Sequence, residues 1–559
     1  MKCKRLGAII LAATLTMGTF VGCQSKAADS AAKANTEGKV KDKIVYSINT
    51  PPTGVFNPLL SDTRYDGNVN GIIYTSLLDV DNDGNLVPSL AESYKVSDDQ
   101  KTITFKINKN AKWHDDKPVT TEDVVFTIES LANPKYTGSY AGNISDIKGV
   151  DAYNKGKAKT IEGIKVVDEN TIEIQLEKAY APAIVNIAGV NIIPKHVWSK
   201  VPVENWEKAT DLLRKPIGSG AYKLSKFEPG QYVEFEAYDK YFGEKAKTKK
   251  FILKVTNPDT LQAELKNGNV DIANIKDMKN NEVENVKKQG FDVATYPDFM
   301  FQYMGFNLRK STFKDKKVRQ AFMYALDRKS MVDKLLEGRG EEINTALLPS
   351  GWAYPESGLN EYKFDVEKAK GLLKEAGWED KNKDGVLENA KGEKFQAELK
   401  YPTGLKAREQ TALIIKESLK KVGVDVKLTS MEFPTLMEQV VANHEFDLYL
   451  MGNTLSSDPD PKPFWYSEAA SDKKGEEGWN IVGYRNKEVD KLLDEGISTI
   501  DRNKRKKTYE QFGKIINEDV PEAFLYVQNN DVAYNKKLKN FKPSTFSEFR
   551  DIEKWYIGE

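Results

Sequence analysis

Cysteine and histidine are scarce in this chain of 559 residues, which contains two cysteines and three histidines. The histidines, His114, His196 and His444, are far apart in the sequence. The chain also lacks the HExxH, G-x-S-x-G and P-loop motifs of metalloproteases, serine hydrolases and nucleotide-binding enzymes. No catalytic residue, cofactor or metal ligand is therefore indicated, and the sequence favours a binding protein over an enzyme.

The chain has no excess of charge of either sign, with 83 basic and 83 acidic side chains. A nucleic-acid-binding protein needs a basic surface to neutralise phosphates, so this balance argues against nucleic acid as a partner. Hydrophobic residues make up 40% and aromatic residues 10% of the chain, which is typical of a globular protein. The length predicts about three or four domain-sized units rather than a single core.

Long apolar runs are absent except near the N-terminus. Three basic residues precede the uncharged segment 6–22, which is too short and too asymmetrically flanked for a spanning helix, and Cys23 follows. The small residue before Cys23 resembles the lipobox of bacterial lipoproteins. We therefore expect a signal peptide at 1–22, a lipid on the Cys23 thiol and a flexible tether at 23–42. An uncleaved membrane anchor is the alternative. Cleavage would remove Cys3 and leave no second thiol for a disulfide.

The stretch 84–131 is predicted to form a turn, two short strands, a second, tight polar turn and a helix. Polar residues alternate with Ile and Phe over 102–108, the two-residue period of a half-buried strand. Turn-forming residues at 114–118 end this strand. Thr120 can then cap a helix, with Asp123 three residues later in place of the usual Glu of a capping box.

Three motifs in this stretch, PSLAESY, TFKI and AKWHDDKPVTTEDVVF, resemble the signature region of the bacterial extracellular solute-binding proteins of family 5. These are peptide- and nickel-type binding proteins of ABC transporters. The resemblance extends from about Lys43 to the end of the chain, and it is strongest to oligopeptide-binding members from Gram-positive bacteria. It implies an α/β, two-lobed periplasmic-binding-protein-like fold (type II, cluster C) with an extra domain inserted in the first lobe. The implied boundaries are 43–74, 194–303 and 523–559 for lobe I, 75–193 for the inserted domain II, and 304–522 for lobe III.

The resemblance also implies a function. The chain would be the substrate-binding lipoprotein of an ABC importer and would capture oligopeptides in the cleft between two lobes. Hinge closure would hold the peptide, and the transporter's permease, driven by its ATPase subunits, would receive it. We expect a monomer at the cell surface, anchored by its lipid to the outer face of the cytoplasmic membrane.

Two segments are implied to contact the ligand, one from each lobe. In lobe I, Asp62, Thr63 and Arg64 match the position where the family offers backbone groups to a peptide. They lie in a polar segment, 60–66, that we expect to be irregular, and a plain surface loop is the alternative. In lobe III, the segment Gly452, Asn453 and Thr454 matches a strand edge that pairs with the main chain of the peptide.

The usual anchor for the amino group of the peptide is missing. In several members of the family an Asp binds this group, and here Leu455 and Ser456 stand at that position. Asp458 and Asp460 are candidates to replace it, although Asp-Pro turns are also common structural caps.

Aromatic pairs flank these segments and allow two interpretations. Trp465 and Tyr466 can wall a side-chain pocket or pack in the core. The same alternatives apply to Trp352 and Tyr354.

The acidic segment 380–388 resembles the start of a calcium loop. An EF-hand needs a bidentate Glu at its twelfth position, where this chain has Lys391. A turn between a helix and a strand is therefore the better interpretation.

Two other classes of function stay open. The same fold hosts binders of other solutes, such as oligosaccharides, nickel chelates and haem. A sugar binder should stack aromatic side chains on its ligand, whereas a peptide binder should present the backbone of a strand edge. A secreted hydrolase with paired carboxylates is the more remote alternative.

Overall fold

The computed structural model describes residues 40–558, except residues 457 and 477. The expected signal peptide, the lipidated Cys23 and the tether up to residue 39 lie outside the described residues. Val40 to Glu559 form one compact unit. Within the part of the chain that the structure describes, no helix has the length and apolar character needed to cross a membrane.

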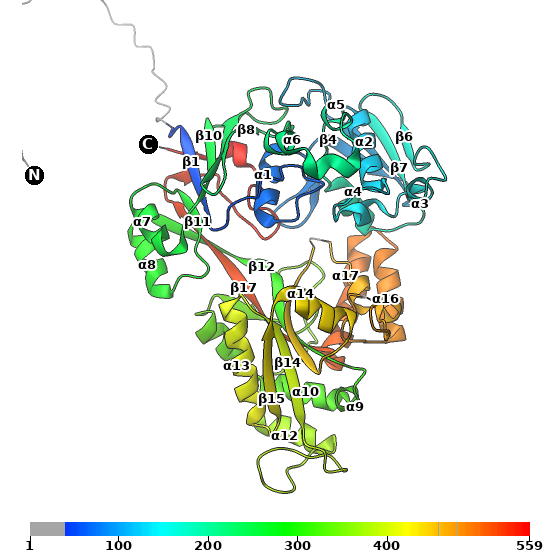
Figure 1. The fold of residues 1–559 in the computed structure, drawn as a ribbon, viewed down its shortest axis with the longest axis vertical. Coiled ribbons are helices and arrows are strands. Elements are labelled where there is room, and N and C mark those ends of the chain that lie inside the picture. The colour runs from blue at the N-terminus through cyan, green and yellow to red at the C-terminus, as the bar shows by residue number, and fades with distance from the viewer. Residues whose placement is uncertain (1–39, 457, 477, 559) are drawn as a thin grey trace, which may run out of the picture. The chain divides into compact units, whose positions relative to one another are not determined.

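An eleven-stranded sheet runs through this unit, and its two halves share two long central strands (Figure 1). These strands, β12 (Phe291–Phe306) and β17 (Glu522–Asn535), pair antiparallel from Phe291↔Asn535 to Gly305↔Glu522. The boundary between lobes I and III expected at 303/304 therefore falls near the end of a long strand that begins at Phe291.

In lobe I, the sheet continues from β17 through three strands that are parallel to one another. In order, they are β11 (Ile272–Asn274), β1 (Lys43–Ile48) and β10 (Lys250–Val255). The antiparallel strands β9 (Tyr232–Ala237) and β8 (Tyr222–Glu228) complete this half. The helices of this lobe include α1 (Arg64–Ile73), α7 (Leu261–Lys266) and α8 (Asn280–Lys288).

The expectation of an irregular segment over 60–66 is wrong from residue 64 onward, because α1 begins there. The Thr63 hydroxyl caps the helix by accepting a hydrogen bond from the Asp66 amide at 3.1 Å. The buried Asp66 carboxylate in turn accepts bonds from the amides of Thr53, Gly54 and Val55 at 2.9–3.2 Å. The helix start is therefore fixed by a loop ten residues upstream, a contact that a local pattern does not reveal.

The signature region forms a separate small sheet. Its four strands are ordered β4 (Ala91–Val96), β5 (Thr102–Ile107), β7 (Thr171–Gln175) and β6 (Ile164–Val166). The predicted capping box is confirmed at the start of α2 (Thr121–Ala132), where the side chains of Thr120 and Asp123 bond each other's backbone amides. The hairpin of β2 (Leu78–Val80) and β3 (Leu86–Pro88) turns at Gly84, whose φ of +76° suits glycine. One continuous hydrophobic cluster joins this region to lobe I.

In lobe III, three parallel strands continue the sheet beyond β12. Their order is β15 (Asp425–Met431), β14 (Gln396–Pro402) and β16 (Leu448–Thr454). Side chains alternate between two cores, one on each face of the sheet: Leu448 and Leu450 lie in one, Tyr449 and Met451 in the other.

Helices cover both faces of this half. Helices α10 (Lys316–Ala325), α12 (Val366–Glu375) and α13 (Lys406–Lys420) contribute to the first core, whereas α14 (Phe433–Leu436), α16 (Lys487–Ile497) and α17 (Arg502–Asp519) contribute to the second. Helix α10 ends before Asp327, whose carboxylate accepts the Ser330 amide at 3.0 Å and caps the next short helix. The remaining short elements are α3 (Val150–Asn154), α4 (Pro182–Ala188), α5 (Lys195–Trp198), α6 (Thr210–Arg214), α9 (Ser311–Lys314), α11 (Arg328–Ser330), α15 (Lys462–Trp465), β13 (Gly340–Glu342), β18 (Leu538–Lys539) and β19 (Tyr556–Ile557).

Candidate functional site

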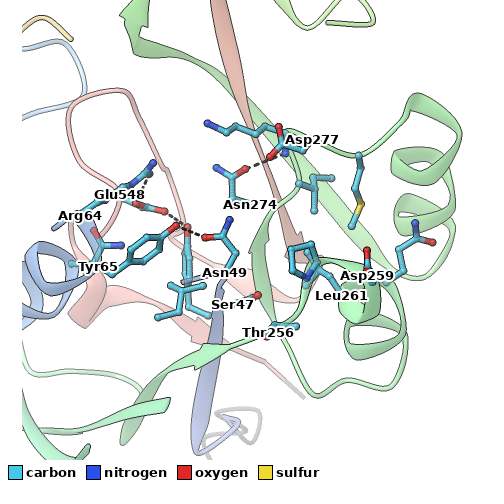
Figure 2. A pocket seen from close by; sticks show the side chains of 18 of the residues that line it. Ser47, Asn49, Arg64, Tyr65, Thr256, Asp259, Leu261, Asn274, Asp277 and Glu548 are labelled. Carbon is cyan, nitrogen blue, oxygen red and sulfur yellow. Dashed lines mark hydrogen bonds and ion pairs between the residues drawn. The ribbon is translucent and has the colours of Figure 1, made fainter. Parts of the chain in front are cut away.

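The carboxyl ends of the parallel strands in lobe I open into a cavity of about 580 Å³. The strand β11 ends there with Asn274, while Asn49 and Thr256 come directly after β1 and β10, and all three line the cavity (Figure 2). Leu405 of lobe III also lines it. In open α/β sheets, ligands bind in the crevice outside the carboxyl ends of the strands. This cavity is therefore the candidate binding site on the side of lobe I.

Lobe III presents a matching crevice. The chain leaves β14 through α13 on one face of the sheet to reach β15, and it leaves β15 through α14 on the other face to reach β16. The connections therefore diverge between β14 and β16, which makes a topological switch point. The residue before α13 is Leu405, which lines the cavity.

The strand β16 has an open edge at this crevice. It pairs with β14 only through Leu399↔Leu448 and Lys400↔Tyr449, while on its other side it pairs with β12 as far as Met300↔Thr454. Among the described strands, none pairs with residues 450–454 on the β14 side. Leu450 and Met451 are buried, whereas Gly452 and Asn453 are half-buried and Thr454 is exposed, so the accessible part of this edge is 452–454. Such an edge can bind an extended chain through main-chain hydrogen bonds alone.

A hydrogen-bonded network lines the wall of the cavity in lobe I. The Glu548 carboxylate accepts the Tyr46 hydroxyl and lies 3.1 Å from the Arg64 guanidinium, while the Tyr65 hydroxyl donates to Asn49 (Figure 2). Burial raises the pKa of Tyr46 far above its usual value, and the Glu548 carboxylate adds to the rise. Tyr46 therefore remains a neutral donor to Glu548 at physiological pH.

The three predicted residues of lobe I have different roles. Asp62 is exposed, Thr63 caps α1, and Arg64 lines the cavity beside Glu548. Burial acts to lower the pKa of Arg64, but the Glu548 carboxylate outweighs it and raises the pKa on balance. Only Arg64 of the three reaches the cavity.

The predicted residues of lobe III lie at and beyond the open edge. Gly452, Asn453 and Thr454 are the last residues of β16. Leu455 and Ser456 line a second, small cavity of about 20 Å³ with Trp352, Tyr354 and Phe546. The C-terminal segment lines both cavities, since Phe546 borders the small one and Glu548 borders the large one. Trp352 and Tyr354 border this small cavity and also pack against the hydrophobic core.

Asp458 and Asp460 are both bonded within the protein. The two carboxylate oxygens of Asp458 accept bonds from the Arg505 guanidinium, one of them at 2.8 Å. Asp460 accepts the Tyr180 hydroxyl at 2.5 Å and the Lys462 amide at 3.1 Å. These bonds favour the structural interpretation of the Asp-Pro turns over an anchor for the ligand.

Trp465 is 3% exposed and packs on Tyr484, Phe512 and Phe524. This environment favours core packing over a pocket wall. Tyr466 is half-buried, and the Lys462 ammonium lies 4.1 Å above its ring.

The acidic loop that begins at Asp380 is a bonded turn. The Asp380 carboxylate accepts the amides of Asp384 and Gly385 at 3.2 and 3.0 Å, and Gly385 has a φ of +88°. Asn382 donates to Asp384 and to Glu388. The turn interpretation is confirmed by these bonds, and among the described residues no group of acidic, histidine or cysteine side chains has the geometry of a metal site.

Comparison with known proteins identifies the family. The model of "Bacterial extracellular solute-binding proteins, family 5 Middle" matches residues 85–476. The chain belongs to this family. It is 34% identical to the oligopeptide-binding protein AppA of Bacillus subtilis over the full length of both chains.

Solved structures of family 5 proteins share the fold. The structure of B. subtilis AppA in complex with a nonapeptide has a TM-score of 0.73 at 32% identity and covers 94% of this chain and all of that one. NikZ of Campylobacter jejuni in complex with Ni(L-His) has a TM-score of 0.73 at 28% identity, covering 92% and 99% of the two chains. The predicted two-lobed α/β fold is confirmed, and the family is one of solute-binding proteins rather than enzymes.

Several site residues of this family member were not predicted from the sequence. Tyr46, Asn274 and Glu548 line the cavity, but nothing in the surrounding sequence marks them.

Proposed function

We propose that this chain is the substrate-binding lipoprotein of an ABC importer and that it captures oligopeptides between lobes I and III. The open edge of β16 at residues 452–454 carries the proposal, because it offers main-chain hydrogen bonds that any peptide can satisfy. The named function of B. subtilis AppA, a relative over its full length, supports the same ligand class.

Arg64 and the neighbouring residues of lobe I would bind the peptide from the opposite side. The cavity of about 580 Å³ leaves room for side chains of different sizes together with bridging water. The backbone of residues 452–454 holds the main chain of the peptide, and the side chains of the peptide are recognised with little selectivity. Asp62, Thr63, Leu455 and Ser456, which are next to Arg64 and Thr454 in the sequence, would contact longer ligands.

Closure would occur about β12 and β17, the strands that both lobes share. Their pairing shifts register between Pro297 and Phe301 and again between Gln302 and Tyr303. Such irregularities interrupt the ladder and allow it to bend. A peptide with contacts on both lobes favours the closed form over the open form, and the permease would bind the closed form.

A lipid on Cys23 would hold the protein at the outer face of the cytoplasmic membrane. The basic n-region, the uncharged segment 6–22 and the small residue before Cys23 support this part of the proposal. The protein acts as a monomer, with the permease and its ATPase subunits as partners in transport.

Mass spectrometry of the small molecules released from purified protein by gentle denaturation tests the function. A mixture of short peptides is expected, and the spread of their lengths shows whether the ends are read. A single sugar, a nickel chelate or haem would refute the peptide proposal while leaving the family intact. Turnover of a co-purifying molecule would instead support the remote hydrolase alternative.

A further inference from the structure

Domain II contacts lobe I and lobe III in different ways. With lobe I it shares one hydrophobic cluster, to which Phe105 of domain II and Phe251 of lobe I both belong. Among the described residues, the clusters of lobe III contain none from domain II, and the cluster shared with lobe I contains none from lobe III. Domain II and lobe I therefore form one body, and lobe III meets domain II without a common core. Contacts between such bodies form and break as the bodies move.

Two backbone amides carry hydrogen bonds across this interface. The Ala181 amide of domain II donates to the Ile497 carbonyl of lobe III at 2.8 Å. The Ile500 amide of lobe III donates to the side-chain oxygen of Gln100 at 2.8 Å. Ile497 ends α16 and Ile500 lies in the short connection to α17, so both bonds reach the same turn of lobe III.

Two side chains add further bonds across the interface. The guanidinium of Arg502, the first residue of α17, donates to the side-chain oxygen of Asn85 and, at 3.4 Å, to the Asp83 carbonyl. The Tyr180 hydroxyl of domain II donates to the Asp460 carboxylate at 2.5 Å. We call the four bonded pairs the latch: Ala181–Ile497, Gln100–Ile500, Asn85–Arg502 and Tyr180–Asp460.

A cavity of about 310 Å³ lies between the two sides of the latch. Domain II lines it with residues that include Leu86, Tyr94 and Val185, and lobe III with residues that include Ile500 and Arg502. Tyr94 and Ile500 are 37% and 40% exposed despite these contacts. The interface is therefore held at separate points and not by close packing. A separation of about 1 Å stretches such hydrogen bonds past their usual limit, so a small opening of the lobes breaks them.

The latch uses none of the groups proposed to hold the ligand. Its bonds involve neither residues 452–454 nor any residue that lines the large cavity. The latch is nevertheless next to the site. Asp460 lies in the loop that follows β16, and Trp352 lines both the small cavity beside Ser456 and the cavity of the latch. The same closure therefore brings the lobes together around a ligand and forms the latch.

We propose that the latch keeps part of the ligand-free population closed. The proposal rests on the hinge closure of the proposed function and not on the identity of the ligand. When a protein binds only in its closed form, the apparent Kd is the intrinsic Kd divided by the closed fraction. The latch therefore tightens the binding of every ligand by the same factor, through bonds that lie within the protein.

Single-molecule fluorescence energy transfer on ligand-free protein tests the latch. Donor and acceptor dyes are attached through Lys157→Cys in domain II and Lys491→Cys in lobe III, both exposed, in the mature chain with Cys23→Ser. Bound molecules are removed by unfolding and refolding, and the released pool is kept. Stripped wild-type protein should show a closed population beside an open one. Adding the released pool should convert both to the closed form.

Variants on both sides of the interface assign the closed population to the latch. Arg502→Gln should lower the ratio of closed to open stripped protein about tenfold, as expected for a hydrogen bond to a charged group, and Tyr180→Phe should also lower it. Asn85→Ala combined with Arg502→Gln should open the protein no further than Arg502→Gln alone, because both remove the same bond. Lys504→Gln, which removes the same charge from an exposed position in the same turn of α17, should behave as wild type. With the released pool at saturation, all variants should reach the closed form of wild type.

Two results overturn the proposal. If stripped wild-type protein is entirely open, or if Arg502→Gln and Tyr180→Phe leave the ratio unchanged, domain II does not hold lobe III. Tyr180→Phe, which removes a single oxygen, covers the case in which Arg502→Gln does not fold, as judged by its circular dichroism melt. Neither result bears on the peptide ligand, which is refuted instead if the released pool contains no peptides.

Discussion

The Asp458–Arg505 pair provides a test that separates a structural carboxylate from a ligand anchor. The side chains of Asp458 and Arg505 are 14% and 5% exposed, and the pair is bidentate. Burial acts to lower the pKa of Arg505, but the Asp458 carboxylate outweighs it, so the pKa is raised on balance. Removing one member of a buried pair typically costs about 3–5 kcal/mol, since the other charge stays buried without its partner.

The expected free energies follow from this geometry. Asp458→Asn keeps one acceptor oxygen and should destabilise the protein by about 3 kcal/mol. Arg505→Met strands the carboxylate and also loses the 2.8 Å bond from Nε to the Gly496 carbonyl, so it should cost at least as much. The double variant should cost about as much as one single variant, which gives a coupling energy of at least about 3 kcal/mol.

Urea unfolding followed by tryptophan fluorescence measures the stabilities, and calorimetry measures peptide affinity. At temperatures below the unfolding transition, Asp458→Asn should bind peptide within about threefold of wild type, a difference of roughly 0.7 kcal/mol. Asp494→Asn is the matched control, since Asp494 pairs with Lys462 at the surface and should change stability by less than about 1 kcal/mol. An affinity loss above about tenfold with an unchanged urea midpoint would refute the structural role and restore Asp458 as the ligand anchor.

Three further predictions concern the packing and the pH dependence of stability. Gly305→Ala should cost about 1–3 kcal/mol in urea unfolding, because its Cβ would lie 2.2 Å from the buried Tyr449 ring; an unchanged midpoint would show that the ring can move away. Burial lowers the pKa of His114 to about 4, so unfolding takes up a proton between pH 6.5 and 4. Stability should therefore fall by up to about 3 kcal/mol as the pH falls through this window, and His114→Gln should lose this contribution, as measured by thermal melts at several pH values. Burial raises the pKa of Glu522 far above its usual value. The group therefore destabilises the fold increasingly as the pH rises above the pKa that Glu522 has in the unfolded chain. Glu522→Gln should raise the melting temperature at pH 8 and not at pH 4. An equal effect at both pH values would show that Glu522 is ionised in the folded protein.

Elements with local signals were predictable from the sequence. The strand β5 occupies residues 102–107 of the alternating pattern at 102–108, and the capping box of α2 and the turn at Gly84 form as their residue types indicate. Each depends on residues at most a few positions apart.

The binding site depends on contacts that no local pattern contains. Tyr46 and Glu548, which share a hydrogen bond on the cavity wall, are separated by 502 positions. Arg408 meets Gln302 across 106 positions, and Asp458 meets Arg505 across 47. Composition and periodicity therefore indicate that a residue is polar or buried, but its partner, which decides between a ligand contact and an internal pair, emerges only from the three-dimensional structure.

The pairing of β12 with β17 has a consequence for how this chain can be divided. Residues of lobe III between these strands, 307–521, leave from Phe306 and return at Glu522, which pairs with the neighbouring Gly305. The hydrophobic clusters of lobe I contain no residue from this interval. Lobe III is thus an uninterrupted insertion between two adjacent strand ends, and a two-residue turn in its place would close β12 and β17 into a hairpin. Lobe III can therefore be removed or exchanged at a single junction, and the strands of lobe I on the other side of the cleft stay in place.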